Sequence, residues 1–155
     1  MHKIFVAVFV FCLVSSATAQ GGGGAVQTAT TVLSSAQLQH LRAAPVQLLQ
    51  APGAGNVVNL VSVVGHYKSG SSVYSLGDGG CFTVALGTER VASLTSAGFI
   101  DKPASQIQFN GASAVGTESD MENKPLMIFN NGSGEWTEGD GSVVVTVYYT
   151  IVALQ

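Results

Sequence analysis

The segment from Val143 to Ile151 has the clearest alternation of side chains in the chain. One face is formed by Val143, Val145, Val147, Tyr149 and Ile151, and the opposite face includes Thr146, Tyr148 and Thr150. A period of two residues is typical of a β-strand. Burying such a face contributes about 1.5–3 kcal/mol per large side chain before chain entropy is subtracted. A strand this apolar promotes aggregation when it is exposed, so we predict that it lies in the interior of a sheet.

Seven further segments have the composition or alternation of strands and are separated by Gly-rich turns. They are residues 26–33, 46–50, 56–67, 73–75 (a short edge strand), 81–86, 106–109 and 126–129. Residues 56–67 are apolar on both faces, which is expected when both sides of a strand are covered. Residues 88–98 are ambiguous, and a helical turn over 91–94 is one interpretation.

A capping box marks the single expected helix. Ser34 is followed three residues later by Gln37, and Pro45 prevents continuation, which predicts a short helix over 35–42. About eight strands with one short helix indicate an all-β domain over residues 26–155, a β-sandwich or jelly roll. An open barrel is the alternative. We find no internal repeat and no second domain.

The N-terminus has the three parts of a secretory signal peptide, predicted as residues 1–19. His2 and Lys3 precede the apolar run Ile4–Val14, and an Ala-x-Ala site ends at Ala19, so cleavage is expected before Gln20. The apolar run is shorter than the roughly 20 residues that span a bilayer. A retained N-terminal anchor is the alternative. Cleavage predicts a secreted, cell-surface or periplasmic protein.

Cleavage would expose a glycine-rich arm, residues 20–25. It begins with Gln20, Gly21, Gly22, Gly23 and Gly24, which cannot hold regular structure alone. Such an arm is either disordered or ordered by a neighbouring subunit. We therefore regard it as a candidate assembly arm.

Charge and composition exclude two classes of partner. Only 10% of residues are charged, the formal net charge is −3, and no Lys/Arg cluster occurs. Nucleic acids and anionic lipids both attract clustered basic residues, so neither is an expected partner. The hydrophobic content of 46% fits a chain whose surface is covered by partners, and equally a compact sandwich.

Residues with catalytic or metal-binding chemistry are sparse. His40 and His66 are the histidines that follow the leader, and neither belongs to a metal-binding spacing. No Gly-x-Ser-x-Gly motif is present. Cys81, the cysteine that remains after cleavage, has no partner for an internal disulfide and is expected to be a buried, inert thiol. We predict no catalytic residues, no metal, no cofactor and no enzymatic activity.

The loop 130–141 holds the candidates for ligand binding. Trp136, the single Trp of the chain, is flanked by Glu135 and Glu138, and an exposed Trp can stack on a sugar. The ring could equally fold back and cap the sandwich. Asn131 begins an Asn-Gly-Ser sequon, which is a glycosylation site in a host that makes N-glycans.

Several blocks of sequence together resemble a family of small tailed-phage and prophage virion structural proteins. The blocks are Ser34–Leu38 (SAQL within it), Pro45–Leu48 (PVQL), Ala51–Val58 (APGAGNVV), Tyr67–Tyr74, Ala97–Asp101 and the ending from Gly139 to Tyr149. The resemblance covers most of residues 30–152, and the APGAG block is its distinctive part. It implies a structural β-domain in a decoration, tail or fibre role, with no catalytic residues to transfer.

The leader departs from the pattern of that family, because virion proteins assemble in the cytoplasm. It favours the same domain used as an exported, self-assembling subunit of a surface layer or filament, with a virion component as the alternative location. The expected partner is a second copy of the chain, in a homo-oligomer or polymer, besides a possible glycan or virion partner. The alternative function is a secreted carbohydrate- or ligand-binding module that uses Trp136.

Overall fold

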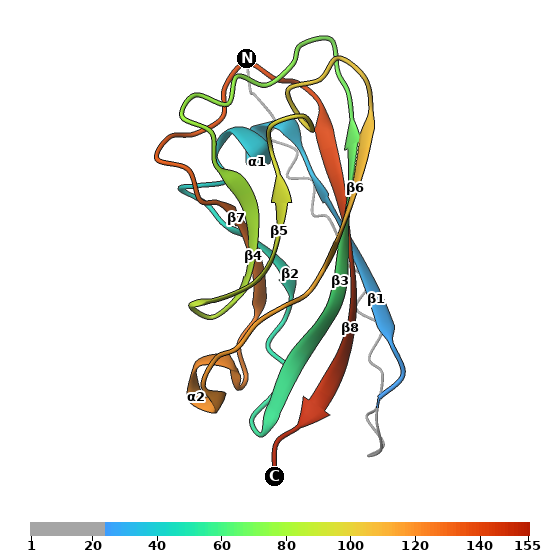
Figure 1. The fold of residues 1–155 in the computed structure, drawn as a ribbon, viewed down its shortest axis with the longest axis vertical. Coiled ribbons are helices and arrows are strands. Elements are labelled where there is room, and N and C mark those ends of the chain that lie inside the picture. Colours follow the sequence, from blue (N-terminus) through green and yellow to red (C-terminus); the bar gives the residue numbers. More distant parts are fainter. Residues whose placement is uncertain (1–23) are drawn as a thin grey trace, which may run out of the picture.

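The computed structural model describes residues 24–155, which form two layers of strands with short helices at either end (Figure 1). In chain order the elements are β1 (Gln27–Leu33), α1 (Ser35–Gln39), β2 (Val46–Leu49), β3 (Asn56–Lys68), β4 (Cys81–Leu86), β5 (Glu89–Thr95), β6 (Gln106–Gly111), α2 (Glu118–Met121), β7 (Leu126–Asn130) and β8 (Ser142–Ala153). The leader 1–19 and arm residues 20–23 lie outside the described residues.

The strands form two antiparallel sheets of four. Sheet A has the order β1-β8-β3-β6, and sheet B has the order β2-β7-β4-β5. The chain therefore pairs β1 with β8, β2 with β7, β3 with β6 and β4 with β5, like one long hairpin whose tip is the β4–β5 turn. Folding that hairpin over itself gives the jelly roll. The predicted all-β sandwich is confirmed, and β8 lies between two strands, as its apolar alternation predicted.

The core fills the space between the two sheets. Alternate residues of sheet A, such as Val63 and Val145, are buried against Phe82 and Ile128 of sheet B. At one end α1 closes the sandwich with Leu38, which is fully buried. The predicted capping box is present: the Ser34 hydroxyl accepts from the Gln37 N–H, and the Gln37 side chain accepts from the Ser34 N–H at 3.0 Å.

Two local expectations are wrong. Residues 91–94 are part of strand β5 and not a helical turn. Residues 73–75 form no strand; Ser75 makes a single β-bridge with Thr137. The segment 111–123 contains the one-turn helix α2. Among residues 24–155, no helix is long and apolar enough to cross a membrane.

Candidate interaction surface

The outward side of sheet A presents three rows of side chains that each cross all four strands. We call this surface the outer A face; its rows are Val32–Val144–His66–Ile107, Thr30–Thr146–Val64–Phe109 and Thr28–Tyr148–Ser62–Gly111. Residues that are opposite one another in register share a face of the sheet. The alternate positions, including Leu33, Val145 and Tyr67, are buried in the core, so these rows point away from it.

Apart from His66, the side chains of the outer A face are apolar or hydroxylated, and the three rows contain no Asp, Glu, Lys or Arg. Phe109 is 76% exposed, Val32 is 59% exposed and Ile107 is 56% exposed. The hydroxyls of Thr30 and Thr146 lie 3.1 Å apart in a cross-strand hydrogen bond. The outer A face is therefore solvent-exposed although it is low in charge and contains large apolar side chains.

Strand β3 explains why the outer A face differs from an ordinary solvated surface. Its sequence is apolar on both faces, which predicted that both sides are covered. Sheet B covers the side that holds Val58 and Val63, but Val61 and Val64 on the other side have no layer over them within residues 24–155. The sequence predicted that both faces of β3 are covered, and within residues 24–155 only the face toward sheet B is covered.

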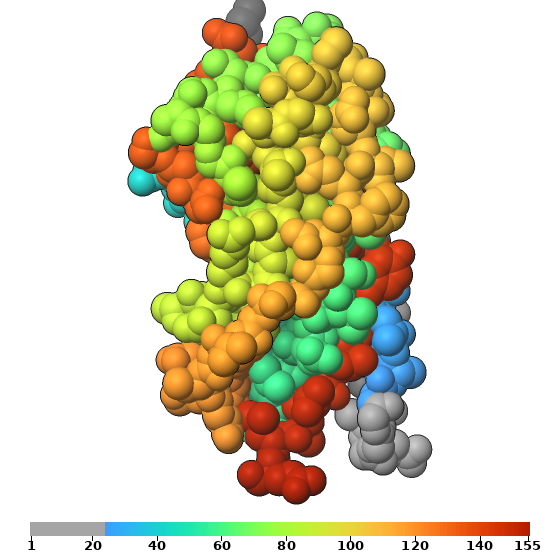
Figure 2. Space-filling model, in the orientation of Figure 1, coloured from blue at the N-terminus to red at the C-terminus, as the bar shows by residue number. Residues whose placement is uncertain are grey.

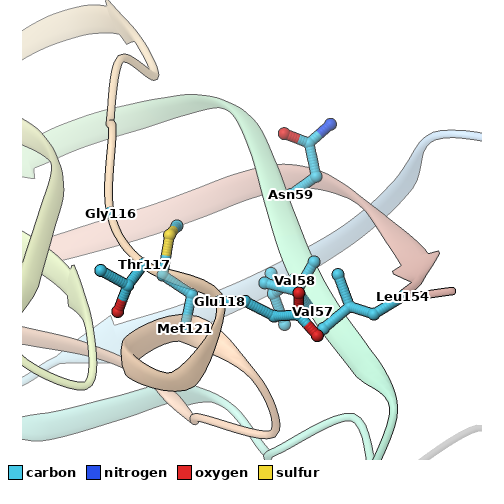
Figure 3. Close-up of a pocket in the computed structure, with 8 residues that line it drawn as sticks. All are labelled: Val57, Val58, Asn59, Gly116, Thr117, Glu118, Met121 and Leu154. Carbon is cyan, nitrogen blue, oxygen red and sulfur yellow. The ribbon is translucent and has the colours of Figure 1, made fainter.

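A hollow of about 290 Å³ lies between α2 and the start of β3 (Figure 3). It is lined by Val57, Val58, Asn59, Gly116, Thr117, Glu118, Met121 and Leu154. Four of these residues have apolar side chains, namely Val57, Val58, Met121 and Leu154, and Glu118 supplies the one carboxylate among them. The Thr117 hydroxyl in the lining donates to the Asp120 carboxylate of α2 (Glu118–Met121), a contact within the fold.

A second hollow, of about 250 Å³, lies where the edges of β5 and β6 meet. Arg90 on its rim donates to the Ser93 hydroxyl at 2.7 Å. Figure 2 shows the segment that follows β6 running across the front of the molecule toward α2. The Ser113 N–H of that segment donates to the Val91 carbonyl at 3.0 Å. This hollow therefore lies along the line where the edges of the two sheets are already joined by hydrogen bonds.

The structure places Trp136 inside the core. The side chain is 0% exposed, its ring centroid lies 4.6 Å from that of Phe82, and its Nε1 donates to the Gly79 carbonyl at 3.2 Å. The ring therefore caps the sandwich, one of the two arrangements the sequence left open, and it offers no exposed face to a sugar. The ligand-binding role of this loop stays a prediction that a binding measurement must test.

The two neighbouring carboxylates do not converge with Trp136. The Glu135 carboxylate accepts hydrogen bonds from the backbone N–H groups of Arg42, at 3.0 Å, and Ala43, at 2.7 Å. Glu135 therefore ties the loop to the turn after α1. Glu138 is exposed and has a positive φ of 69°. The structure thus assigns a structural contact to one carboxylate and a turn position to the other.

The remaining candidates lie apart from one another. Asn131 is exposed, and its Oδ1 accepts from the Cys81 N–H at 2.7 Å; its glycosylation stays a prediction. Cys81 is a free, half-buried thiol. Gly24, the first described residue of the arm, lies beside β8 near the Ile151 carbonyl. Residues 24–155 contain no group of three His, Cys, Asp or Glu side chains placed to hold a metal.

The Asp140 carboxylate has a shifted pKa and holds a neighbouring turn in place. Hydrogen bonds from the Ser71 hydroxyl at 2.5 Å, and from the backbone N–H groups of Ser72 and Ser71, hold the pKa of Asp140 below its usual range. Nearby, burial raises the pKa of Tyr74, whose hydroxyl donates to the Gly141 carbonyl at 2.7 Å. Both groups are occupied by contacts within the fold, so the perturbation has a structural cause.

Comparisons with known proteins give little to set beside this geometry. No protein-family model matches the chain, and no curated protein matches it. A solved structure titled "Cyanophage Pam1 capsid asymmetric unit" is similar to it, with a TM-score of 0.39 and 15% identity over 87% of this chain and 91% of that chain. A likeness at that level carries no weight, so fold and function rest on the topology and surface of this chain. The family resemblance in the sequence stays a prediction.

Proposed function

We propose that this chain is an exported, non-enzymatic structural subunit that assembles with further copies of itself. The observation that carries the proposal is the outer A face, an exposed apolar sheet surface whose three rows contain no Asp, Glu, Lys or Arg. The leader predicted at residues 1–19 would place the subunit outside the cytoplasm. A surface layer, a filament and a virion decoration are the assemblies that such a subunit could form.

The composition of the outer A face supports contact with protein. The cores of protein interfaces are depleted in charge and enriched in aromatic side chains, and Phe109 and Tyr148 lie on this face. Contact between two copies of an uncharged face also removes no charge from water, so burial carries no ionic desolvation cost.

The size of the outer A face is also suitable. Four strands about 4.8 Å apart, crossed by three rows about 7 Å apart, give a footprint on the order of 400 Å². Exposed Val61 and Val152 extend the apolar surface along the two long strands. Contiguous apolar patches of a few hundred Å² on soluble proteins commonly mark interaction sites.

The test measures molar mass by light scattering during size-exclusion chromatography of the mature chain, residues 20–155. We expect a mass above that of one chain for the wild type. The double substitution Ile107→Lys and Phe109→Lys places two charges on the outer A face and should lower the measured mass. The matched control is Val115→Lys, because Val115 is 98% exposed in the loop after β6 and lies off the face.

Thermal unfolding of each variant establishes that it is folded, since exposed positions on a sheet tolerate polar side chains. A wild type that stays monomeric at its highest soluble concentration would refute the proposal. So would a double variant that assembles as well as the Val115→Lys control. A monomer that binds glycan would favour the alternative function.

A further inference from the structure

Besides its faces, a β-sandwich can contact other chains through the edge strands of its sheets. The edge strands here are β1 and β6 in sheet A and β2 and β5 in sheet B. An edge strand exposes a row of N–H and C=O groups that can pair with another strand, and proteins usually cover, shorten or charge their edges to prevent this. Comparing the four edges shows which one remains open.

Edges β5 and β6 cover each other. The Gln108 side chain of β6 accepts from the Thr95 N–H at 3.0 Å and donates to the Thr95 carbonyl at 3.1 Å. The Asn110 amide of β6 donates to the Ser93 carbonyl. These side-chain amides take the place of a neighbouring strand along β5, so this side of the sandwich is closed.

Edge β2 is protected by its shape. It has four residues, its register with β7 shifts between Gln47 and Leu49, and Pro45 directly precedes it. Short, irregular edges next to proline are poor templates for pairing, because proline lacks an N–H and the regular ladder is interrupted.

Edge β1 has none of these protections. It has seven residues in unbroken register with β8, from Gln27 to Leu33, and contains no charge and no proline. Within residues 24–155, no hydrogen bond other than the ladder with β8 reaches the backbone of β1. Every second residue of such a strand directs its N–H and C=O outward. β1 is thus the open edge of the sandwich.

We propose that two copies of the chain pair along β1, antiparallel about a two-fold axis through Thr30, so that two A sheets join into one eight-stranded sheet. This inference rests on the proposed function and adds a second contact between copies, along a sheet edge. Thr30 is the middle residue of β1, so an axis there pairs all seven residues. Thr30 then lies opposite Thr30 of the second copy, and Thr28 lies opposite Val32 of the second copy.

This register agrees with the side chains of β1. Because paired residues differ by an even number of positions, outward side chains meet outward side chains and the two cores stay on the same side. The hydroxyl pair of Thr30 and Thr146 would continue into the second copy as a row of four threonines, and cross-strand Thr–Thr pairs are favourable. With no charge on β1, identical copies bring no like charges together.

After cleavage before Gln20, the arm residues that precede Gly24 would be too few to cover the open edge of β1. Residues 20–23 reach at most about 14 Å when fully extended, whereas seven residues of β1 extend about 24 Å. Gly24 also lies beside β8, where it leaves the fold near Ile151. The β1 strand of a second copy matches the open edge in length and direction.

Disulfide formation tests the pairing in the mature chain carrying Cys81→Ser, which removes its own thiol. At the axis, Thr30→Cys would place two Cα atoms about 4.5–5.5 Å apart, within the range that a disulfide bridges. The matched control is Thr28→Cys on the same face, whose two copies would lie about 14 Å apart along the strands. Under mild oxidation we expect most Thr30→Cys protein to run as a covalent dimer, and Thr28→Cys to stay a single chain.

The outcomes separate this inference from the proposed function. If the wild type assembles but Thr30→Cys does not cross-link, pairing along β1 is wrong and the structural role stands. Cross-linking of Thr28→Cys to the same extent as Thr30→Cys would also overturn the Thr30-centred pairing. A wild type that is monomeric throughout removes the proposed function, and pairing along β1 with it.

Discussion

Replacing Trp136 by alanine tests whether this side chain belongs to the core or to a binding loop. In the structure the ring is fully buried, contacts Phe82 and donates from Nε1 to the Gly79 carbonyl. Truncation would leave a cavity the size of an indole between the loop and sheet B. It would also leave the Gly79 carbonyl without this donor.

The expected cost follows from these contacts. Phe or Trp to Ala substitutions in cores cost about 3–5 kcal/mol, and loss of the part-buried hydrogen bond to the Gly79 carbonyl adds to this cost. We therefore expect Trp136→Ala to lower the free energy of unfolding by about 4 kcal/mol. Domains of this size commonly have about 5–15 kcal/mol in total, so the variant would be close to unfolding. Its melting temperature should fall by roughly 10–15 °C.

Urea denaturation followed by circular dichroism measures this change, with an unchanged m-value as the sign that the same fold unfolds. Trp136→Phe is the matched control: it keeps an aromatic ring against Phe82 and loses the hydrogen bond, so we expect a smaller cost of about 1–2 kcal/mol. A cost below about 1 kcal/mol for Trp136→Ala would refute the core assignment. Lost glycan affinity with unchanged stability would instead support the binding loop.

Two further predictions concern the turn that precedes β8. Asp140→Asn should lower the melting temperature at pH 7, because the carboxylate accepts several hydrogen bonds from the 71–72 turn. Since the folded pKa of Asp140 is depressed, the advantage of the wild type is complete above the ordinary value of 3.8 and decreases as the pH falls through the lower folded pKa. A gap that does not shrink as the pH is lowered below 3.8 contradicts this. Gly139→Ala should cost about 1–3 kcal/mol, because its Cβ would lie 2.3 Å from the buried ring of Tyr74. The control Gly134→Ala, whose nearest neighbour lies at 3.6 Å, should unfold like the wild type.

The strands that sequence predicted correctly are those whose pattern is local. β8 alternates over nearly its full length, and burial along it follows the same period from Val143 to Val147. The capping box at Ser34 was equally visible, because its donors and acceptors lie within four residues. In such segments the residues that determine the local conformation are close together in sequence.

Strand β5 was missed because a bulge interrupts its period. The register with β4 shifts between Val84 and Ala85, where Ala92 and Arg90 are the successive partners and Val91 is the extra residue. Val91 and Ala92 are consequently both buried although they are neighbours in sequence. Two adjacent apolar residues break the alternation of a strand, which made a helical turn appear equally suitable.

The candidate surface could be predicted only in part, because it depends on which strands are neighbours. The apolar outward side of residues 56–67 was visible in the sequence, but Val32, Phe109 and Tyr148 join it only through the order β1-β8-β3-β6. Those residues are far apart along the chain, and no local pattern brings them together. The burial of Trp136 has the same origin, since its partner Phe82 lies on β4 in sheet B.

The outer A face and the open edge of β1 belong to the same sheet, and their combination determines what assembly results. Pairing along β1 about a two-fold axis uses up the edge of both copies and, alone, stops at a dimer. That dimer would present two outer A faces side by side on one continuous sheet. Contact between the faces of two such dimers adds a second two-fold axis: the assembly closes as a tetramer if the two axes intersect at right angles, and it continues as a chain if they do not intersect. A filament therefore requires both contacts, whereas either one alone gives only a dimer.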